Sequence, residues 1–500
     1  MRKFIMLICL VLFTTLLEVN TAEASGPTRI DGANRYDVAV NVSREGWTTS
    51  NTVIISSGDA YADALAASPL AYRLNAPILL TRAGSLPDTT KKRLQELRAS
   101  NVIVIGGTTS VSDNVISEIR RLGSSINVRR ISGKDRFEVA ANIANELPAK
   151  NIAIVANGRA EADSLSIAPY AARNGIPILL TESNSIPSIT STTLRNRNVS
   201  TTYVMGGETS VSRTVFNNLP STTKTRIGGN DRFQVATNVV KQLNLNAKKA
   251  YIANGHAYAD ALAGSVLAAK QNSVILLTQP TQVPSTTINV IKEKGIGTFV
   301  VLGGTTSVGT NVVRTLSAPM LGKRVAIDAG HGGTDPGAVG NGVQEKTVVL
   351  DIAKRLESKV TTAGSLPLMT RTNDVYIPLA DRVLDAQNRG ADIFVSIHAN
   401  SFTDPSSNGT ETWYNGRYQS KESKELAEAI QGELVKELGL RDRGVKEGSF
   451  VVIRDSQMPS VLVEIAFISN PDEAKLLANA SFREKAAQAI YNGVEKYFSN

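Results

Sequence analysis

Three short motifs recur in the same order three times along the first two-thirds of the 500-residue chain. One places a glycine between two arginines, one runs from a glycine to Asp, a small residue and Leu, and one carries Gly-Gly before Thr-Ser-Val. The nine copies begin at Arg29, Arg130 and Arg226, at Ser57, Asn157 and Asn254, and at Ile105, Met205 and Leu302. Such self-similarity indicates tandem structural units, and a unit of roughly 100 residues is large enough to be a small domain.

Within each unit, short β-branched runs alternate with helical patterns. In the first unit, 52–56, 77–81 and 102–107 are predicted strands, whereas 60–74 and 89–99 are predicted helices. This alternation is typical of a parallel sheet with helices on both faces. The chain is therefore predicted to be an α/β protein with three tandem doubly wound repeat domains. Their expected boundaries are 27–125, 126–222 and 223–318.

The repeated arginines Arg35, Arg136 and Arg232 have two interpretations. They could form a polyanion site with their glycine loops, because ligands of α/β sheets bind at strand ends. They could instead pair with a repeated acid of their own unit, and this interpretation is the one we favour. The candidate acids are Asp63, Asp163 and Asp260.

These repeats resemble the cell-wall-binding repeat type 2 family of Gram-positive surface proteins over residues 27–318. The resemblance implies non-covalent attachment to anionic wall polymers such as teichoic acid. The second copy departs from the others at 159–161, and the third has Val266 in place of Pro69 and Pro169. Three equivalent sites are therefore not assumed.

The first residues predict export. Arg2 and Lys3 precede an apolar run over 4–17, and Ala22-Glu23-Ala24 is a small-residue cleavage pattern. We expect a signal peptide over 1–24 that carries away the single cysteine, so the mature chain has no disulfide. No later stretch has the ~20 apolar residues of a membrane helix, so an integral membrane protein is not expected.

The charge of the chain indicates its partners. Basic and acidic residues of the signal peptide balance, so the mature chain keeps the formal net charge of +9. A basic exported protein concentrates on polyanions. Outside the cell these are wall polymers and the membrane surface, and nucleic acid is not an expected ligand.

A different pattern begins at Lys323, and it carries candidate catalytic residues. His331 and His398 follow apolar strands, Glu345 opens a predicted helix, and Glu464 ends another apolar strand. Two imidazoles and one carboxylate suit a zinc site with a vacant position for water. Glu464 is the candidate general base. Here 410–414 and 451–453 are among the further predicted strands of an α/β domain over 323–500 with a central mixed sheet.

This part resembles the zinc-dependent N-acetylmuramoyl-L-alanine amidases of type 3. The motifs that carry the resemblance lie at 328–333, 335–338, 345–346, 370–371, 396–400 and 463–470. It implies that His331, Glu345 and His398 bind Zn²⁺ and that Glu464 is the catalytic acid and base. Ala466 stands where the family commonly has glycine.

Two further residues of these motifs, Arg371 and Asn400, are candidates for substrate binding. An internal ion pair or a turn hydrogen bond would explain each of them equally well. Nearby acids, among them Asp335 and Asp374, are expected to be caps or loop braces and not ligands.

Together the two resemblances imply a secreted peptidoglycan hydrolase of a Gram-positive cell wall. The combination resembles the autolysins of Bacillus-type rods, which cleave the bond between N-acetylmuramic acid and L-alanine, and a modifier protein is a possible partner. The alternatives are a zinc endopeptidase of the stem peptide and a non-catalytic wall-binding surface protein.

Overall fold

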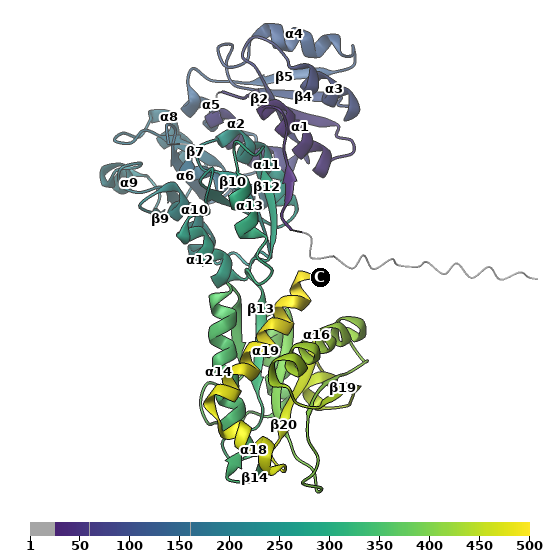
Figure 1. Ribbon diagram of the computed structural model, residues 1–500. Coiled ribbons are helices and arrows are strands. Elements are labelled where there is room, and N and C mark those ends of the chain that lie inside the picture. Colours follow the sequence, from purple (N-terminus) through teal and green to yellow (C-terminus); the bar gives the residue numbers. More distant parts are fainter. Residues whose placement is uncertain (1–25, 60, 161) are drawn as a thin grey trace, which may run out of the picture.

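The computed structural model describes residues 26–59, 61–160 and 162–500. The expected signal peptide over 1–24, with its cysteine, lies outside these residues. Within them, no helix combines the length and the apolar character that a membrane crossing requires. The repeats form one body and the C-terminal third another, joined near residue 320 (Figure 1).

Each repeat is built on a parallel sheet, as predicted, but the sheet has four strands and not the three that the sequence of one unit predicts. The first repeat holds α1 (Arg35–Gly46), β2 (Thr52–Ser57), α2 (Tyr61–Arg73), β3 (Ile78–Thr81), α3 (Asp88–Glu96), β4 (Asn101–Ile105) and α4 (Asp113–Arg121). The second holds β5 (Asn127–Ile131), α5 (Arg136–Asn145), β6 (Ile152–Asn157), α6 (Ala162–Leu165), α7 (Ala168–Asn174), β7 (Ile178–Thr181), α8 (Ser188–Asn196), β8 (Thr201–Met205) and α9 (Arg213–Asn218). The third holds β9 (Thr223–Ile227), α10 (Arg232–Gln242), β10 (Lys249–Asn254), α11 (Tyr258–Lys270), β11 (Val274–Thr278), α12 (Ser285–Lys294), β12 (Thr298–Leu302) and α13 (Thr310–Leu316).

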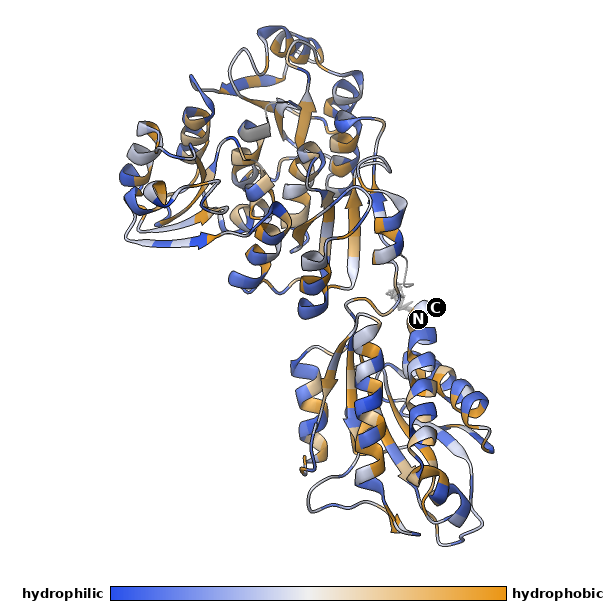
Figure 2. Ribbon diagram, turned by 60° about the vertical axis from the view of Figure 1, so that its left-hand side comes forward, coloured by the Kyte–Doolittle hydropathy of each residue, from blue (hydrophilic) through white to orange (hydrophobic). Residues whose placement is uncertain are grey.

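Both faces of these sheets are buried. In β6, Ile154 belongs to a core shared by all three repeats, whereas Val155 belongs to a core on the opposite face of the sheet. Successive strand residues point to opposite faces, so helices cover each side. Figure 2 shows the resulting apolar strands inside each body and hydrophilic helix surfaces outside.

The sheets exchange strands between repeats. By sequence β5 opens the second repeat, yet it pairs with β4 and completes the sheet of the first, with Ile131 beside Ile105. In the same way β9 completes the second sheet. The strand β1 (Thr28–Ile30) pairs with β12 of the third repeat, with Ile30 beside Leu302. The exchange therefore closes the three repeats into a ring.

Three helices fill the centre of the ring. α2, α7 and α11 pack against one another, and their apolar side chains form one continuous core. Ser68 of α2 and Ser265 of α11 share a hydrogen bond of 2.8 Å between their hydroxyl oxygens. A repeat therefore buries its central helix against the other two repeats.

The strand exchange also decides the partners of the repeated arginines, and the expected pairing with Asp63, Asp163 and Asp260 of the same unit is wrong. Arg35 does pair with an acid of its own unit, but this acid is Asp59, at 2.7 Å, and the other two repeats have no acid at that position. Each arginine donates to the carbonyl oxygen of its own unit's glycine, at 2.6 Å for Arg35 to Gly58 and 2.6 Å for Arg136 to Gly158. The buried acids instead feel the arginine of the following repeat. Burial raises the pKa of Asp63 to about 6, and the charge of Arg136 opposes this shift.

The other two acids repeat this arrangement around the ring. Burial raises the pKa of Asp163 and of Asp260. The opposing charge comes from Arg232 for Asp163, and from Arg35 for Asp260. Because the next repeat's first strand lies on the open sheet edge, its arginine reaches the preceding repeat's strand ends.

The C-terminal body has a six-stranded mixed sheet in the order β16-β13-β17-β20-β18-β19. β18 runs antiparallel to β20, and the other neighbours are parallel, which confirms the predicted mixed sheet. Its strands are β13 (Arg324–Ala329), β16 (Leu366–Met369), β17 (Ile393–Asn400), β18 (Thr410–Tyr414), β19 (Asp442–Glu447) and β20 (Ser460–Phe467), with a separate hairpin of β14 (Val339–Gly340) and β15 (Val343–Gln344). Its helices are α14 (Glu345–Thr362), α15 (Leu379–Asn388), α16 (Ser420–Leu438), α17 (Val451–Arg454), α18 (Pro471–Ala478) and α19 (Ala480–Ser499).

One predicted strand of this body is wrong. Residues 451–453 form the helix α17, whose Val452 and Ile453 are buried in the core under the sheet. A short apolar run has no periodicity that separates a buried strand from a buried helix. The strand β19 lies just before it, in a polar segment that we did not predict.

The connection between the two bodies is short and buried. Leu321 belongs to the core of the third repeat, and the adjacent Met320 to the core of the C-terminal body. An ion pair of 3.6 Å between Lys248 and Asp392 also joins them. Neighbouring residues anchored in two cores restrict hinge motion at this point.

We expect Gly106→Ala to destabilise the ring of repeats. Gly106 has φ +105°, and an added Cβ would lie 2.7 Å from Asp63 Oδ2. Strain of this kind costs about 1–3 kcal/mol. Gly84→Ala is the matched control, because nothing lies within 4 Å of its added Cβ. Denaturant unfolding should separate the two variants, and equal stabilities would contradict the close approach of Asp63.

Candidate active site

The candidate metal ligands meet where parallel strands end. His331 follows β13, His398 lies in β17, and Glu345 opens α14. Glycines make the approach possible: a Cβ on Gly330 would lie 2.6 Å from His398 Nε2, and one on Gly337 would lie 2.7 Å from His331 Cδ2. Glycine therefore occupies the positions around the site where the candidate ligands must come close together.

The three candidate ligands lie close together. His331 Nε2 is 3.1 Å and His398 Nδ1 is 2.8 Å from Glu345 Oε1. One ligand atom from each residue lies within 4.8 Å of the others. The structure thus brings together all three residues that the sequence singled out, in a group that could hold a metal ion.

The charges of the group are strongly coupled. Burial by itself would raise the pKa of Glu345, but the hydrogen bonds from His331 and His398 outweigh it and hold that pKa well below its usual range. For His331, burial lowers the pKa, yet the carboxylates of Glu345 and Asp335 raise it to about 9. The Glu345 carboxylate is therefore bonded to both imidazoles.

Glu464 lies beside the group on the neighbouring strand. It is paired in register with His398, between β20 and β17. The residue is half-buried as a whole, but its Oε2 is covered and has no hydrogen-bond partner among the described residues. Burial raises its pKa to about 7, against the charge of His398. The group is thus a carboxyl that can hold or release a proton near neutral pH.

A buried ion pair supports the loop that carries His331. Asp328 Oδ1 accepts a 2.8 Å hydrogen bond from Arg382 Nη1, and both side chains are 1 % exposed. Arg382 also donates to the carbonyl oxygens of Ala329 and His331, each at 2.7 Å. His331 itself has φ +58°, in the left-handed region. The pair therefore fixes a strained backbone at His331, the first candidate ligand.

The expected loop braces are present. Asp335 Oδ2 lies 2.7 Å from His331 Nδ1, which leaves Nε2 facing Glu345. Such an outer carboxylate orients a ligating histidine. Asp374 accepts hydrogen bonds from the Gly333 backbone and the Lys346 ammonium group. Neither acid belongs to the three-residue group.

The two candidate substrate-binding residues have internal partners. Arg371 is buried and donates to the carbonyl oxygens of Ala329 and Gly330, at 2.9 and 2.7 Å. Asn400 donates to Glu411 at 3.0 Å. These bonds match the internal alternative that the sequence left open, and contact of either residue with a substrate stays a prediction.

Sequence reasoning missed Arg382 and Glu411. Arg382 lies on the buried stripe of α15 beside Val383 and Ala386, and its role comes from the proximity of Asp328 in space. Glu411 ends up beside Asn400 because β18 is inserted between β20 and β19. Each residue has its partners on other elements, and nothing in the local sequence identifies them.

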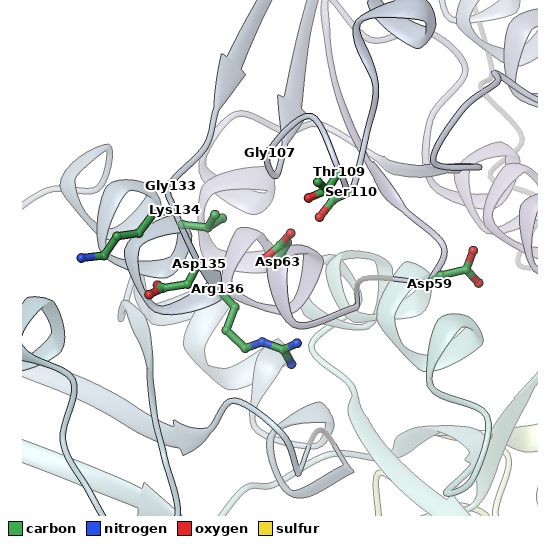
Figure 3. A pocket seen from close by; sticks show the side chains of 10 residues that line it. Asp59, Asp63, Gly107, Thr109, Ser110, Gly133, Lys134, Asp135 and Arg136 are labelled. Carbon is green, nitrogen blue, oxygen red and sulfur yellow. The ribbon is translucent and has the colours of Figure 1, made fainter.

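A second kind of candidate site lies at the repeat junctions. A crevice of about 160 Å³ is lined by Asp63, Thr109 and Ser110 of the first repeat and by Lys134, Asp135 and Arg136 of the second. Figure 3 shows Asp63 between the loop of Thr109 and Ser110 and the segment of Asp135 and Arg136.

The next junction has the matching crevice, of about 580 Å³. It is lined by Asp163, Thr209 and Ser210 of the second repeat and by Asp231 and Arg232 of the third. Both crevices thus combine acids with cations at the carboxyl ends of parallel strands, where α/β sheets bind ligands.

Two family models match the chain. The model described as N-acetylmuramoyl-L-alanine amidase matches residues 325–496. The model described as cell wall binding domain 2 matches three segments, 29–116, 130–216 and 226–313.

Individual proteins show similarity as well. The N-acetylmuramoyl-L-alanine amidase LytC of Bacillus subtilis is 44% identical over 499 residues, which cover 100% of both chains. The amidase enhancer of the same organism is 38% identical over 58% of this chain and 40% of its own. Among solved structures, Cwp6 from Clostridium difficile has a TM-score of 0.56 and 30% identity, over 94% of this chain and 80% of its own.

We expect Arg382→Met to destabilise the C-terminal body by about 3–5 kcal/mol, because it leaves the buried Asp328 carboxylate without its cation. Arg389→Met, at the C-cap of the same helix, is the control, since the side chains of Arg389 and its partner Asp385 are 41% and 50% exposed. That change should cost about 1 kcal/mol or less. Thermal and denaturant unfolding measure both, and equal losses would contradict the role of the buried pair.

Proposed function

The chain belongs to the family of N-acetylmuramoyl-L-alanine amidases that carry cell wall binding domain 2 repeats, and from that premise we propose how its residues act. It is a peptidoglycan hydrolase, an autolysin that cleaves the amide bond between N-acetylmuramic acid and L-alanine. Neither an endopeptidase nor a non-catalytic surface protein agrees with that family.

We propose that His331, Glu345 and His398 hold a zinc ion. The donor set supports this, since two imidazole nitrogens and one carboxylate are typical of catalytic zinc sites with an open position. The unpartnered, covered Oε2 of Glu464 beside them supports it further. A zinc ion held there would supply a Lewis acid for the carbonyl group and lower the pKa of water.

Glu464 is proposed to move the proton. Its carboxylate takes a proton from the water that attacks the lactyl carbonyl carbon, and returns this proton to the departing amine of L-alanine. A pKa of about 7 suits both directions at neutral pH. Asp335 keeps the Nε2 of His331 directed at the site, and Arg371 and Arg382 hold the loop that carries it.

The repeats bind wall polymers, as the cell wall binding domains imply. We propose that anionic polymers such as teichoic acid bind at the junction crevices, with Lys134 and Arg136 facing the anionic groups at the first junction. Attachment at more than one crevice would raise the local concentration of the catalytic body on its substrate.

Location and partners follow from the same premise. The chain acts at the cell wall, and we propose that the segment 1–24 directs its secretion. A modifier partner is also proposed, supported by the similarity to a protein named amidase enhancer.

Glu464→Gln is expected to lower wall hydrolysis by about 10²–10⁴-fold, since the amide cannot accept the proton. Zinc content and sedimentation with walls should not change. Glu428→Gln is the control, because this exposed residue lies on α16 away from the ligand group. The assay follows new N-terminal alanine and new reducing ends, with and without a chelator. An active Glu464→Gln enzyme would mean that another group moves the proton.

Lys134→Gln is expected to weaken binding to purified walls by up to about fivefold at low salt, which corresponds to ~1 kcal/mol for an exposed charge pair. The difference should shrink as salt screens it. Lys92→Gln removes the same charge from an exposed position of α3 outside the crevice. Sedimentation with walls compares them, and equal losses would show that only the net charge matters.

A further inference from the structure

The active site continues across the sheet into a row of charged residues. His398 of β17 is in register with Glu464 of β20, and Glu464 is in register with Glu411 of β18. On the next strand, Lys446 of β19 is in register with Trp413 of β18. Residues in register point to the same face of a sheet, so the row extends from the metal ligands to the outer strand.

Glu411 is the centre of this extension. It is 3% exposed, and its Oε1 accepts hydrogen bonds from Asn400 and Trp413 at 3.0 and 3.1 Å. Its Oε2 accepts one bond from Arg443 and one from Lys446, each at 2.6 Å. One carboxylate thus holds two cations, and the buried carboxyl of Glu473 also faces Arg443.

The two cations keep free hydrogen-bonding capacity. Of the three ammonium hydrogens of Lys446, one is used by Glu411, and Arg443 Nη2 has no hydrogen-bond partner among the described residues. The side chains of Arg443 and Lys446 are 27% and 32% exposed, unlike Glu411. Both cations therefore have N–H donors that Glu411 does not use, and these donors are available to a ligand that accepts hydrogen bonds.

An apolar wall borders the same cations. Lys446 Nζ lies 5.1 Å from the ring centre of Trp413, and the exposed Phe450 meets that ring edge-on at 5.3 Å. The positive groups are therefore held at fixed positions beside an aromatic surface. Such an arrangement is suited to a carboxylate on a short chain, because ordering costs little once the cations are fixed.

The distance across the sheet determines which part of a substrate reaches them. β19 is two strands from β20, and strands lie about 4.8 Å apart, so the cations are about 10 Å from the strand of Glu464. An extended peptide spans about 3.4 Å per residue. The cations are thus reached by roughly the second or third residue after the cleaved bond.

We propose that Arg443 and Lys446 bind a free carboxylate of the stem peptide, near its second or third residue, and so select acidic stem peptides over amidated ones. The inference rests on the proposed function of the site. The N-acetylated glycan on the other side of the cleaved bond is uncharged, so a free carboxylate of the peptide is the group that the unused donors of Arg443 and Lys446 can recognise.

The test uses the full chain and two muramoyl peptides. One peptide has free carboxylates, and the other has carboxamides at the same positions. The wild type should prefer the free acid by about tenfold in kcat/KM, which is the scale of one charged hydrogen bond. This preference should come from a lower KM for the free acid. In Lys446→Met the preference should fall to within about twofold, and Lys446→Arg should restore it. Lys436→Met is the control, because that exposed lysine lies on α16 and pairs with Glu433.

Equal loss on both peptides would overturn the inference and assign Lys446 to the fold alone, as would a loss confined to kcat. A second measurement separates it from the proposed function. The acidic peptide is titrated into Glu464→Gln, alone and combined with Lys446→Met, and binding is followed by calorimetry. If the wild type cleaves neither peptide, the proposed function fails, while tenfold weaker binding in the double variant still supports the carboxylate site. Equal binding in both variants overturns the carboxylate site.

Discussion

The open edge of each repeat's sheet is the constraint on which the ring depends. The three strands that a repeat supplies itself, such as β3, β2 and β4, leave unpaired backbone groups along the outer side of β4. An exposed edge invites pairing with another chain, and here the first strand of the following repeat occupies it. The third repeat has no successor, so β1 from the start of the chain fills its edge. Ring closure follows from this shortage of strands, and three repeats are the number that the central helices α2, α7 and α11 enclose.

The same exchange creates the junctions. It carries the arginine and the helix start of one repeat to the strand ends of the preceding one, so that Asp63 is influenced by Arg136 and not by Arg35. Each crevice is therefore built by two repeats and exists only in the assembled ring. In the C-terminal body, the strand ends hold His331 and His398. The buried Asp328–Arg382 pair stabilises the loop that carries His331.

Much of this architecture is readable in the sequence because it is encoded locally. The alternation of apolar runs and helical patterns predicts the parallel sheets, and the rule that parallel strands end at one edge predicts that His331, Glu345 and His398 meet. What could not be predicted depends on neighbours distant in the chain. The segment that forms β5 is short and its burial alternates, so nothing in it says which sheet it joins. The same is true of Arg382 and Glu411, whose importance comes only from partners on other elements, and of α17, where a buried apolar run reads equally well as a strand.

The charge distribution separates attraction from recognition. The chain carries a formal net charge of +9, but the crevices are not basic: acids such as Asp63 and Asp163 lie beside Arg136 and Arg232. A net charge acts over about a Debye length, ~8 Å at physiological ionic strength, and draws the protein to an anionic wall without selecting a site. A crevice of mixed charge acts only on contact, where a desolvated acid at its base discriminates against a purely anionic ligand. Selection in the repeats must therefore depend on the polar and hydrogen-bonding groups of a polymer as well as on its charge. Because Met320 and Leu321 anchor the two bodies to each other through their cores, a polymer held by the ring also restricts where along the wall the row from His398 to Lys446 can meet its peptide.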